Sequence, residues 1–331
     1  MSGLIKSAIF SLFLALFAVS SAAPVSAQSV PGVSEPVTFQ ISPEFPRPNT
    51  SVTISAQSYT TDLDRAAFTW YVGNKVFKKG TGITEVTVPV GTAAVSVSVD
   101  VTTTDIGTIS KSATIRPGSV DLLWQSDGYT PPFYKGKALE SYGAAFKVVA
   151  VAELFGPNGK KTDPKTLVYT WKKNGTTDAA QSGYGKDSYT GTQSSYVRGG
   201  DDISVEASTV SRDAGATRTI TISPTVPEVV FYENSPLYGM VYEKALTGSI
   251  ALTGEEITLK AVPFNVSALN PLSGLSLDWT LNGDALADFK DEDQITLRTT
   301  GTAGGQSNVG VSIQNKTKLL QGGQADISIF Q

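Results

Sequence analysis

The sequence contains no cysteine and no histidine. Without cysteine the chain has no disulfide bonds, no thiolate nucleophile and no cysteine-ligated metal or haem. Without histidine it lacks the usual general base of Ser-His and Cys-His catalytic pairs. We therefore expect no cofactor, no metal site and no catalytic residue, and we do not expect an enzyme.

Charge is also scarce, because charged residues make up 17% of the 331 residues, compared with about 25% in typical soluble chains. The formal net charge is −4, and residues 225–331 hold 12 Asp and Glu against 6 Lys and Arg. No segment carries the excess of positive charge that binding to a phosphate backbone requires. Nucleic acid is thus not an expected partner.

Long apolar runs are nearly missing as well. The main one, residues 8–19, is shorter than the ~20 residues that span a bilayer. It follows Lys6 and precedes small residues that end in Val25-Ser26-Ala27, which is the layout of a secretory signal peptide. We expect the export machinery to cleave residues 1–27, leaving a flexible lead-in at 28–35. The alternative is an uncleaved anchor.

The expected product is soluble and lies outside the cytoplasm, either extracellular or in the cell envelope, with no C-terminal anchor. An exported chain of this size without cysteine is unlike disulfide-stapled eukaryotic ectodomains. The sequence therefore indicates a bacterial source.

Hydroxyl residues are abundant instead, because serine and threonine together number 72. Three short segments match one another around a tryptophan: FTWYVGN at 68–74, YTWKKNG at 169–175 and LDWTLNG at 277–283. The tryptophans lie 101 and 108 residues apart, about the length of one small sandwich domain. Two copies end in Asn-Gly, a strong hairpin signal because both turn residues must adopt positive φ. In the first copy, at 68–74, the pair is inverted to Gly73-Asn74.

Alternating apolar residues flank each tryptophan, as at 52–56, 146–150 and 257–261 before it and at 95–101, 203–207 and 309–313 after it. This period of two predicts half-buried antiparallel strands. The expected fold is all-β: three tandem immunoglobulin-like antiparallel β-sandwiches after a signal peptide, with domains at 36–116, 117–224 and 225–331. The linkers at 116–118 and 223–227 are short and contain proline, so we expect stiff joints.

The second and third units share a further motif, which is FYKGKAL at 133–139 and VYEKAL at 241–246. Together with the tryptophan segments and WQSDGY at 124–129, it resembles bacterial tandem Ig-like and PKD-like extracytoplasmic modules. It is also similar to uncharacterised exported proteins of candidate-phylum bacteria. The resemblance implies a surface or adhesive role and supplies no binding residues. The tryptophans themselves are expected in the three cores, not on a ligand platform.

Carboxylates are the remaining acid and base candidates, and they are scattered over predicted turns. One cluster follows the third hairpin and consists of Asp284, Asp288, Asp291, Glu292 and Asp293. Oxygen-rich loops suit calcium, but the ordered spacing of a calcium loop is missing. We expect a solvated acidic loop, with a calcium site as the alternative.

The strongest candidate for partner binding is the segment from Ser182 to Asp202, because it is the longest expected loop. It carries Tyr184, Tyr189, Tyr196 and Arg198 among glycine, serine and threonine. Tyrosines in such a setting are typical of loop paratopes. The alternative is an irregular edge strand whose tyrosines pack on the second domain itself.

Two functions follow from these observations. The first is a non-catalytic surface or envelope protein, a structural or adhesive array of Ig-like modules that contacts a protein partner at the cell surface. The second is an extracytoplasmic protein that binds a carbohydrate or another ligand. A glycan site would need exposed aromatic side chains on one concave face, whereas a spacer would not.

Overall fold

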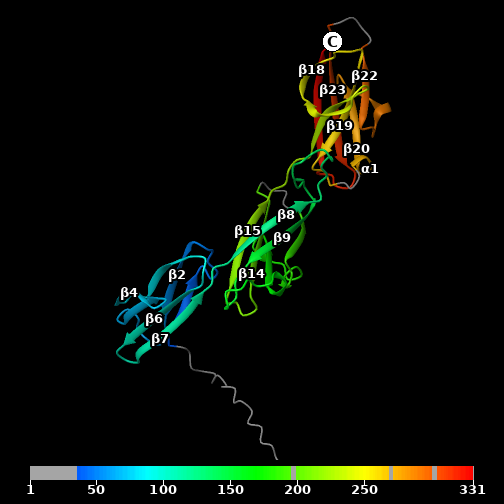
Figure 1. Cartoon of the computed structure of the whole chain (residues 1–331). Helices are drawn as coiled ribbons and strands as arrows, with labels where there is room; N and C mark the ends of the chain where they lie inside the picture. The colour runs from blue at the N-terminus through cyan, green and yellow to red at the C-terminus, as the bar shows by residue number, and fades with distance from the viewer. Residues whose placement is uncertain (1–35, 195–198, 268–270, 300–303, 331) are drawn as a thin grey trace, which may run out of the picture.

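A computed structural model describes residues 36–194, 199–267, 271–299 and 304–330. Within these ranges the chain forms three β-sandwiches in tandem, which follow one another from blue to red in Figure 1. Helical structure in the described part is limited to the four-residue α1 (Pro271–Gly274) and the single turns η1 (Pro164–Thr166) and η2 (Ala287–Phe289). The expected class, all-β with three tandem Ig-like sandwiches, is confirmed.

The first domain is a sandwich of a three-stranded and a four-stranded sheet. The smaller sheet has the order β1 (Thr38–Ser42), β2 (Thr50–Gln57), β5 (Glu85–Val90). The larger has the order β4 (Lys75–Thr81), β3 (Ala67–Val72), β6 (Val95–Thr103), β7 (Gly107–Ile115).

The second domain repeats this plan. One sheet has the order β13 (Ser188–Thr192), β9 (Ala145–Glu153), β8 (Ser119–Ser126). The other has the order β11 (Thr176–Thr177), β10 (Val168–Lys173), β14 (Asp201–Ser208), β15 (Gly215–Ile222), and β12 (Gly183–Tyr184) also pairs with β10.

The third domain has four and five strands. Its first sheet has the order β17 (Gly239–Leu246), β16 (Glu228–Ser235), β19 (Glu256–Phe264), β22 (Gln294–Arg298). Its second has the order β18 (Gly248–Ala251), β24 (Gly322–Phe330), β23 (Gln306–Asn315), β20 (Leu275–Leu281), β21 (Asp284–Ala285). The pairing of β18 with β24 is parallel, which departs from the otherwise antiparallel ladders.

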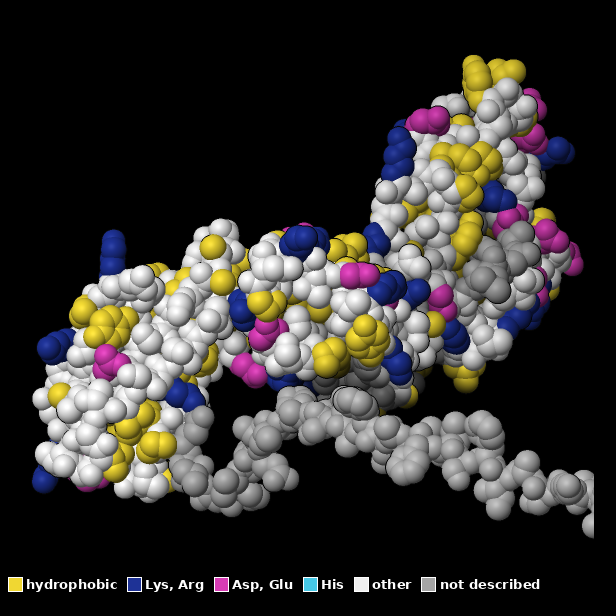
Figure 2. Space-filling view, turned by 60° about the horizontal axis from the view of Figure 1, so that its bottom comes forward, with side chains coloured by type: hydrophobic (Ala, Val, Ile, Leu, Met, Phe, Trp, Pro, Cys, Tyr) yellow, Lys and Arg dark blue, Asp and Glu magenta, His cyan; other side chains and the backbone are white. Residues whose placement is uncertain are grey.

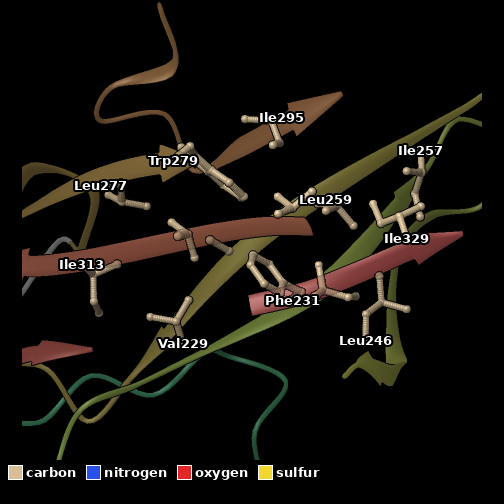
Figure 3. Packing of buried hydrophobic residues seen from close by; sticks show 14 of the residues in the cluster. Val229, Phe231, Leu246, Ile257, Leu259, Leu277, Trp279, Ile295, Ile313 and Ile329 are labelled. Carbon is tan, nitrogen blue, oxygen red and sulfur yellow. The ribbon is translucent and has the colours of Figure 1, made fainter. Parts of the chain in front are cut away.

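The matching tryptophans occupy equivalent places in the three cores. Trp70, Trp171 and Trp279 are each at most 1% exposed. Each indole Nε1–H donates to a backbone carbonyl downstream, that of Ile83 at 2.7 Å, Lys186 at 2.9 Å and Glu292 at 2.8 Å. A buried indole needs such an acceptor, because an unpaired N–H inside a core is costly. Figure 3 shows Trp279 facing Phe231 and Leu259 in the third core.

The hairpins after the tryptophan strands differ in detail. Asn174 and Gly175 both have positive φ (50° and 79°), as do Asn282 and Gly283 (52° and 91°), as a type I′ turn requires. In the first domain Gly73 has a φ of 59°, and a register shift at Trp70/Tyr71 accompanies the turn. The inverted Gly-Asn pair thus makes a hairpin of a different type.

The shared motif of the second and third domains has two different structures. In the third domain residues 241–246 belong to β17, which pairs with β16. In the second domain residues 133–139 form no strand, and β8 remains an edge strand of its sheet. Two prolines, Pro131 and Pro132, precede this copy, and proline cannot donate to a ladder. Residues 133–139 instead lie against the third domain.

Candidate functional site: the joint between the second and third domains

The segment between β8 and β9, residues 127–144, joins the second domain to the third. The N–H of Tyr129 donates to the carbonyl of Val266 at 2.7 Å, and the N–H of Asn265 donates back to the carbonyl of Tyr129 at 2.8 Å. The side chain of Asn265 also accepts from the N–H of Leu139 at 3.0 Å. In Figure 1 this green segment reaches the yellow and red strands of the third domain.

The side chain of Gln321 holds the same segment from the opposite side of the joint. Gln321 is fully buried. Its Nε2 donates to the carbonyl of Tyr142 at 2.6 Å, and its Oε1 accepts from the N–H of Ser267 and from Nδ2 of Asn315, both at 2.9 Å. The amide is therefore satisfied on both sides, and it ties residues of both domains into one polar network.

Aromatic side chains form the apolar half of the joint. The ring of Phe133 stacks on Tyr242, with centroids 3.9 Å apart, and meets Tyr232 edge-on at 5.3 Å. Tyr134 meets Phe264 edge-on at 5.4 Å. Tyr232 and Phe264 are buried, and such pairs add stability beyond the area they bury. The joint therefore combines a hydrophobic contact with specific hydrogen bonds.

Glu140 lies at the end of this segment and is fully buried. Its carbonyl accepts from the N–H of Thr225 in the linker at 2.6 Å, but neither carboxylate oxygen has a hydrogen-bond partner among the described residues. Burial raises the pKa of Glu140 to about 8. Asp201 and Asp127 raise this pKa further, whereas Lys173 and Lys137 oppose the shift. At neutral pH the carboxyl is therefore mostly protonated.

The joint between the first and second domains is also built from specific contacts. Arg212 bridges Glu44 of the first domain and Glu206 of the second, at 2.8 Å each, and its guanidinium lies 5.2 Å from the ring of Phe45. Arg116 pairs with Asp213 at 3.3 Å. The N–H of Gly118 donates to the carbonyl of Pro46 at 3.2 Å.

Of the four residues predicted for partner binding, the structure describes Tyr184 and Tyr189. Tyr184 is 61% exposed, whereas Tyr189 is 3% exposed and lies between Phe146 and Trp171, at centroid distances of 6.1 Å and 5.6 Å. Tyr196 and Arg198 fall outside the described residues.

For Tyr189 the loop prediction is wrong, and the alternative of an edge strand that packs on the second domain agrees with the structure. Residues 182–202 contain β12 and β13, and β13 completes a sheet by pairing with β9. Alternation along β13 turns Tyr189 into the core, so it cannot contact a partner.

The acidic cluster of the third domain makes internal contacts. Asp291 accepts from the N–H of Leu277 at 3.1 Å and pairs with Lys316 at 3.2 Å, and Asp293 pairs with Lys260. In the ranges that the structure covers, no group of three or more His, Cys, Asp or Glu side chains is arranged to hold a metal ion. This geometry gives no support to the calcium alternative.

The expected signal peptide, residues 1–27, and the lead-in to residue 35 lie outside the described residues. Within the part that is described, no helix is both long and apolar enough to cross a membrane.

Comparisons with known proteins give no family for the chain. No protein-family model matches it, and no curated protein matches it. Among solved structures it is similar to the three N-terminal domains of the highly immunogenic outer capsid protein of bacteriophage RB49. The two sequences are 16% identical, the match covers 89% of this chain and 98% of that chain, and the TM-score is 0.27.

Two further solved structures are similar. One is SGBP-B of the Bacteroides ovatus mixed-linkage glucan utilization locus, with 13% identity, 90% and 71% coverage and a TM-score of 0.21. The other is a bacterial ice-binding adhesin, with 10% identity, 88% and 95% coverage and a TM-score of 0.23. At these identities and TM-scores the likeness transfers no function to this chain.

The motif at 133–139 is visible in the sequence, but its contact with the third domain was not predicted. The available signal was the run YTPPFY at 129–134, in which two prolines interrupt a dense set of aromatics. Such a run cannot continue a ladder and is rich in side chains that bury well, which favours docking on another surface.

Proposed function

We propose that the chain is a non-catalytic exported protein of the bacterial cell surface or envelope. Its three Ig-like modules act as a stiff array that spaces or joins surface components and presents a face to a protein partner. The observation that carries this proposal is the joint between the second and third domains, where a whole segment of one domain is bound by the other.

Stiffness is the property that such a role needs. Domains joined by a short linker move relative to one another unless their interface is large and apolar. Here the aromatic contact of Phe133 and the buried amide of Gln321 hold one joint. At the other joint the ring of Phe45 packs on Gly215 and on the guanidinium of Arg212. A flexible tether would not need two such joints.

The surface charge agrees with a protein partner. On the face shown in Figure 2, Lys and Arg are interspersed with Asp and Glu, and hydrophobic side chains occur in small separate groups. A surface on which positive and negative side chains alternate favours short-range contacts with a protein over binding to a highly charged polymer such as nucleic acid.

Two measurements test the proposal. Cells that produce the full chain are fractionated, and we expect the protein in the envelope or the medium with its N-terminus at Gln28. Small-angle scattering of this processed protein is expected to fit one extended conformer. Retention of an uncut chain in the cytoplasm, or scattering from a broad mixture of shapes, would contradict the proposal.

The second candidate function, binding of a carbohydrate or another ligand, has one specific observation in its favour. It requires aromatic side chains on a concave face, and a hollow at the joint between the second and third domains has them. Tyr129 and Phe133 line it from one domain and Tyr242 from the other.

A further inference from the structure

The hollow at this joint has a volume of about 250 Å³. The segment of the second domain supplies Tyr129 and Phe133, and the third domain supplies Tyr242, Lys260 and Asp293. It exists only because the two domains are joined, since each contributes part of its lining. Pockets between domains are common places for small ligands.

One wall of the hollow is aromatic. Phe133 covers one face of the Tyr242 ring, yet Tyr242 remains 36% exposed. The face of an aromatic ring is electron-rich, and it attracts the weakly positive C–H groups on the flat side of a sugar ring. An aromatic side chain that is held in place by a second ring also loses little conformational freedom when a ligand binds.

The other wall carries polar groups that balance in charge. Lys260 pairs with one oxygen of Asp293, Oδ2, and both side chains are only partly buried. Within the described part of the chain, Oδ1 of Asp293 and the hydroxyl groups of Tyr129 and Tyr242 have no hydrogen-bond partner. Because the charges of Lys260 and Asp293 cancel, the hollow suits a neutral ligand with many hydroxyl groups better than an ion.

The phenol of Tyr129 stays neutral at physiological pH. Burial raises the pKa of Tyr129, and the proximity of Tyr242 raises it further. A neutral phenol can both donate and accept a hydrogen bond, which matches the hydroxyl groups of a sugar. Tyr129 and Tyr242 line the same hollow, so one small molecule can contact both side chains.

The size of the hollow narrows the ligand class. Pockets for drug-sized ligands have volumes of about 300–1,000 Å³, so about 250 Å³ is suited to a smaller unit. We propose that the hollow between Tyr129, Phe133, Tyr242, Lys260 and Asp293 binds one neutral sugar ring, free or as part of a glycan. This inference rests on the second candidate function, and its failure leaves the spacing role intact.

The test uses the purified protein and two sets of probes. Saturation-transfer NMR with the methyl glycosides of glucose, galactose, mannose and N-acetylglucosamine detects a site for a free sugar. An array of oligosaccharides and bacterial polysaccharides detects a site for a sugar within a chain. We expect binding in at least one set, with the transferred saturation on one face of the sugar.

Variants then locate the site. Tyr242→Phe keeps the ring on Phe133 and removes the hydroxyl, so we expect a loss of about fivefold in affinity, the usual effect of one neutral hydrogen bond. Asp293→Asn is expected to weaken binding by about tenfold, because a charged acceptor is lost. The matched control is Tyr238→Phe, because Tyr238 is 81% exposed and lies just before β17, outside the hollow.

Two results would overturn the proposal. The first is that the unmodified protein binds no probe in either set. The second is that Tyr242→Phe and Asp293→Asn bind as tightly as the unmodified protein. Scattering of each variant checks that the joint itself is unchanged.

Discussion

The ring of Phe133 lies face to face with the ring of Tyr242 across the boundary between the second and third domains, with centroids 3.9 Å apart and planes inclined by 21°. Both residues belong to copies of the same motif. In the third domain the motif is strand β17 at the edge of a four-stranded sheet, and the corresponding sheet of the second domain has only three strands. The copy at 133–139, which forms no strand in the second domain, therefore packs on the copy in β17 of the third domain.

The buried amide of Gln321 gives the first prediction. Gln321→Ala leaves the carbonyl of Tyr142, the N–H of Ser267 and Nδ2 of Asn315 without this partner. Unpaired buried groups cost about 1–3 kcal/mol each, and partial rearrangement reduces the total. We expect a loss of about 2–3 kcal/mol in unfolding free energy and faster amide exchange in residues 127–144. Gln324→Ala, at an exposed position of the same strand region, is the control and should change neither quantity.

The first joint gives the second prediction. A Cβ built on Gly215 would lie 2.7 Å from the ring of Phe45, too close for any ordinary contact. Gly215→Ala should therefore displace the first domain, with a broader distance distribution in scattering and a loss of about 1–3 kcal/mol, as overpacking usually produces. Gly91→Ala, where nothing lies within 4 Å, is the control.

A second substitution checks the cause. If the clash with Phe45 is responsible, the double variant Gly215→Ala, Phe45→Ala should recover the narrow distance distribution of the unmodified chain. A double variant as disturbed as Gly215→Ala alone would show that another contact is affected.

The tyrosines of the second domain give the third prediction. Tyr189 is buried between Phe146 and Trp171, so Tyr189→Ala should lower the unfolding free energy by about 3 kcal/mol, the usual cost of removing a buried aromatic side chain. Tyr184→Ala, at an exposed side chain, should change it by less than about 0.5 kcal/mol. Chemical denaturation measures both. Equal effects would mean that Tyr189 does not pack in the core.

Local pattern was enough to predict the strands, because period-two alternation and a buried tryptophan are properties of short segments. Trp171 and the Asn174-Gly175 turn are examples, and both were predicted residue by residue. For Tyr189 the sequence left a loop and an edge strand open, because its segment is rich in glycine and serine, which weakens the alternation that marks a strand. Its strand forms through pairing with β9, a contact between residues distant in sequence.

The joint could not be predicted for a related reason. The motif at 133–139 shares Tyr, Lys, Ala and Leu with β17. Its different conformation depends on Pro131, Pro132 and on a surface that the third domain provides. Gln321 shows the same limit, since a lone glutamine gives no sign of its three partners, Tyr142, Ser267 and Asn315. Such interactions are specified by tertiary geometry and have no local pattern.

Glu140 gives the last prediction, a dependence of stability on pH. Its pKa in the folded protein is about 8, above the ordinary value of 4.5, so the folded state holds a proton that the unfolded state releases. Stability from this group is therefore fully present below about pH 4.5 and is lost as the pH rises through about 8.

The variant Glu140→Gln mimics the protonated side chain at every pH. At pH 5 it should unfold at nearly the same denaturant concentration as the unmodified protein. At pH 9 it should be more stable by ~2–4 kcal/mol, since each pKa unit corresponds to about 1.4 kcal/mol. Glu153→Gln, at an exposed pair with Lys161, is the matched control and should show no gain at pH 9. If Glu140→Gln follows the unmodified protein at both pH values, the carboxyl of Glu140 is not held in its neutral form by the joint.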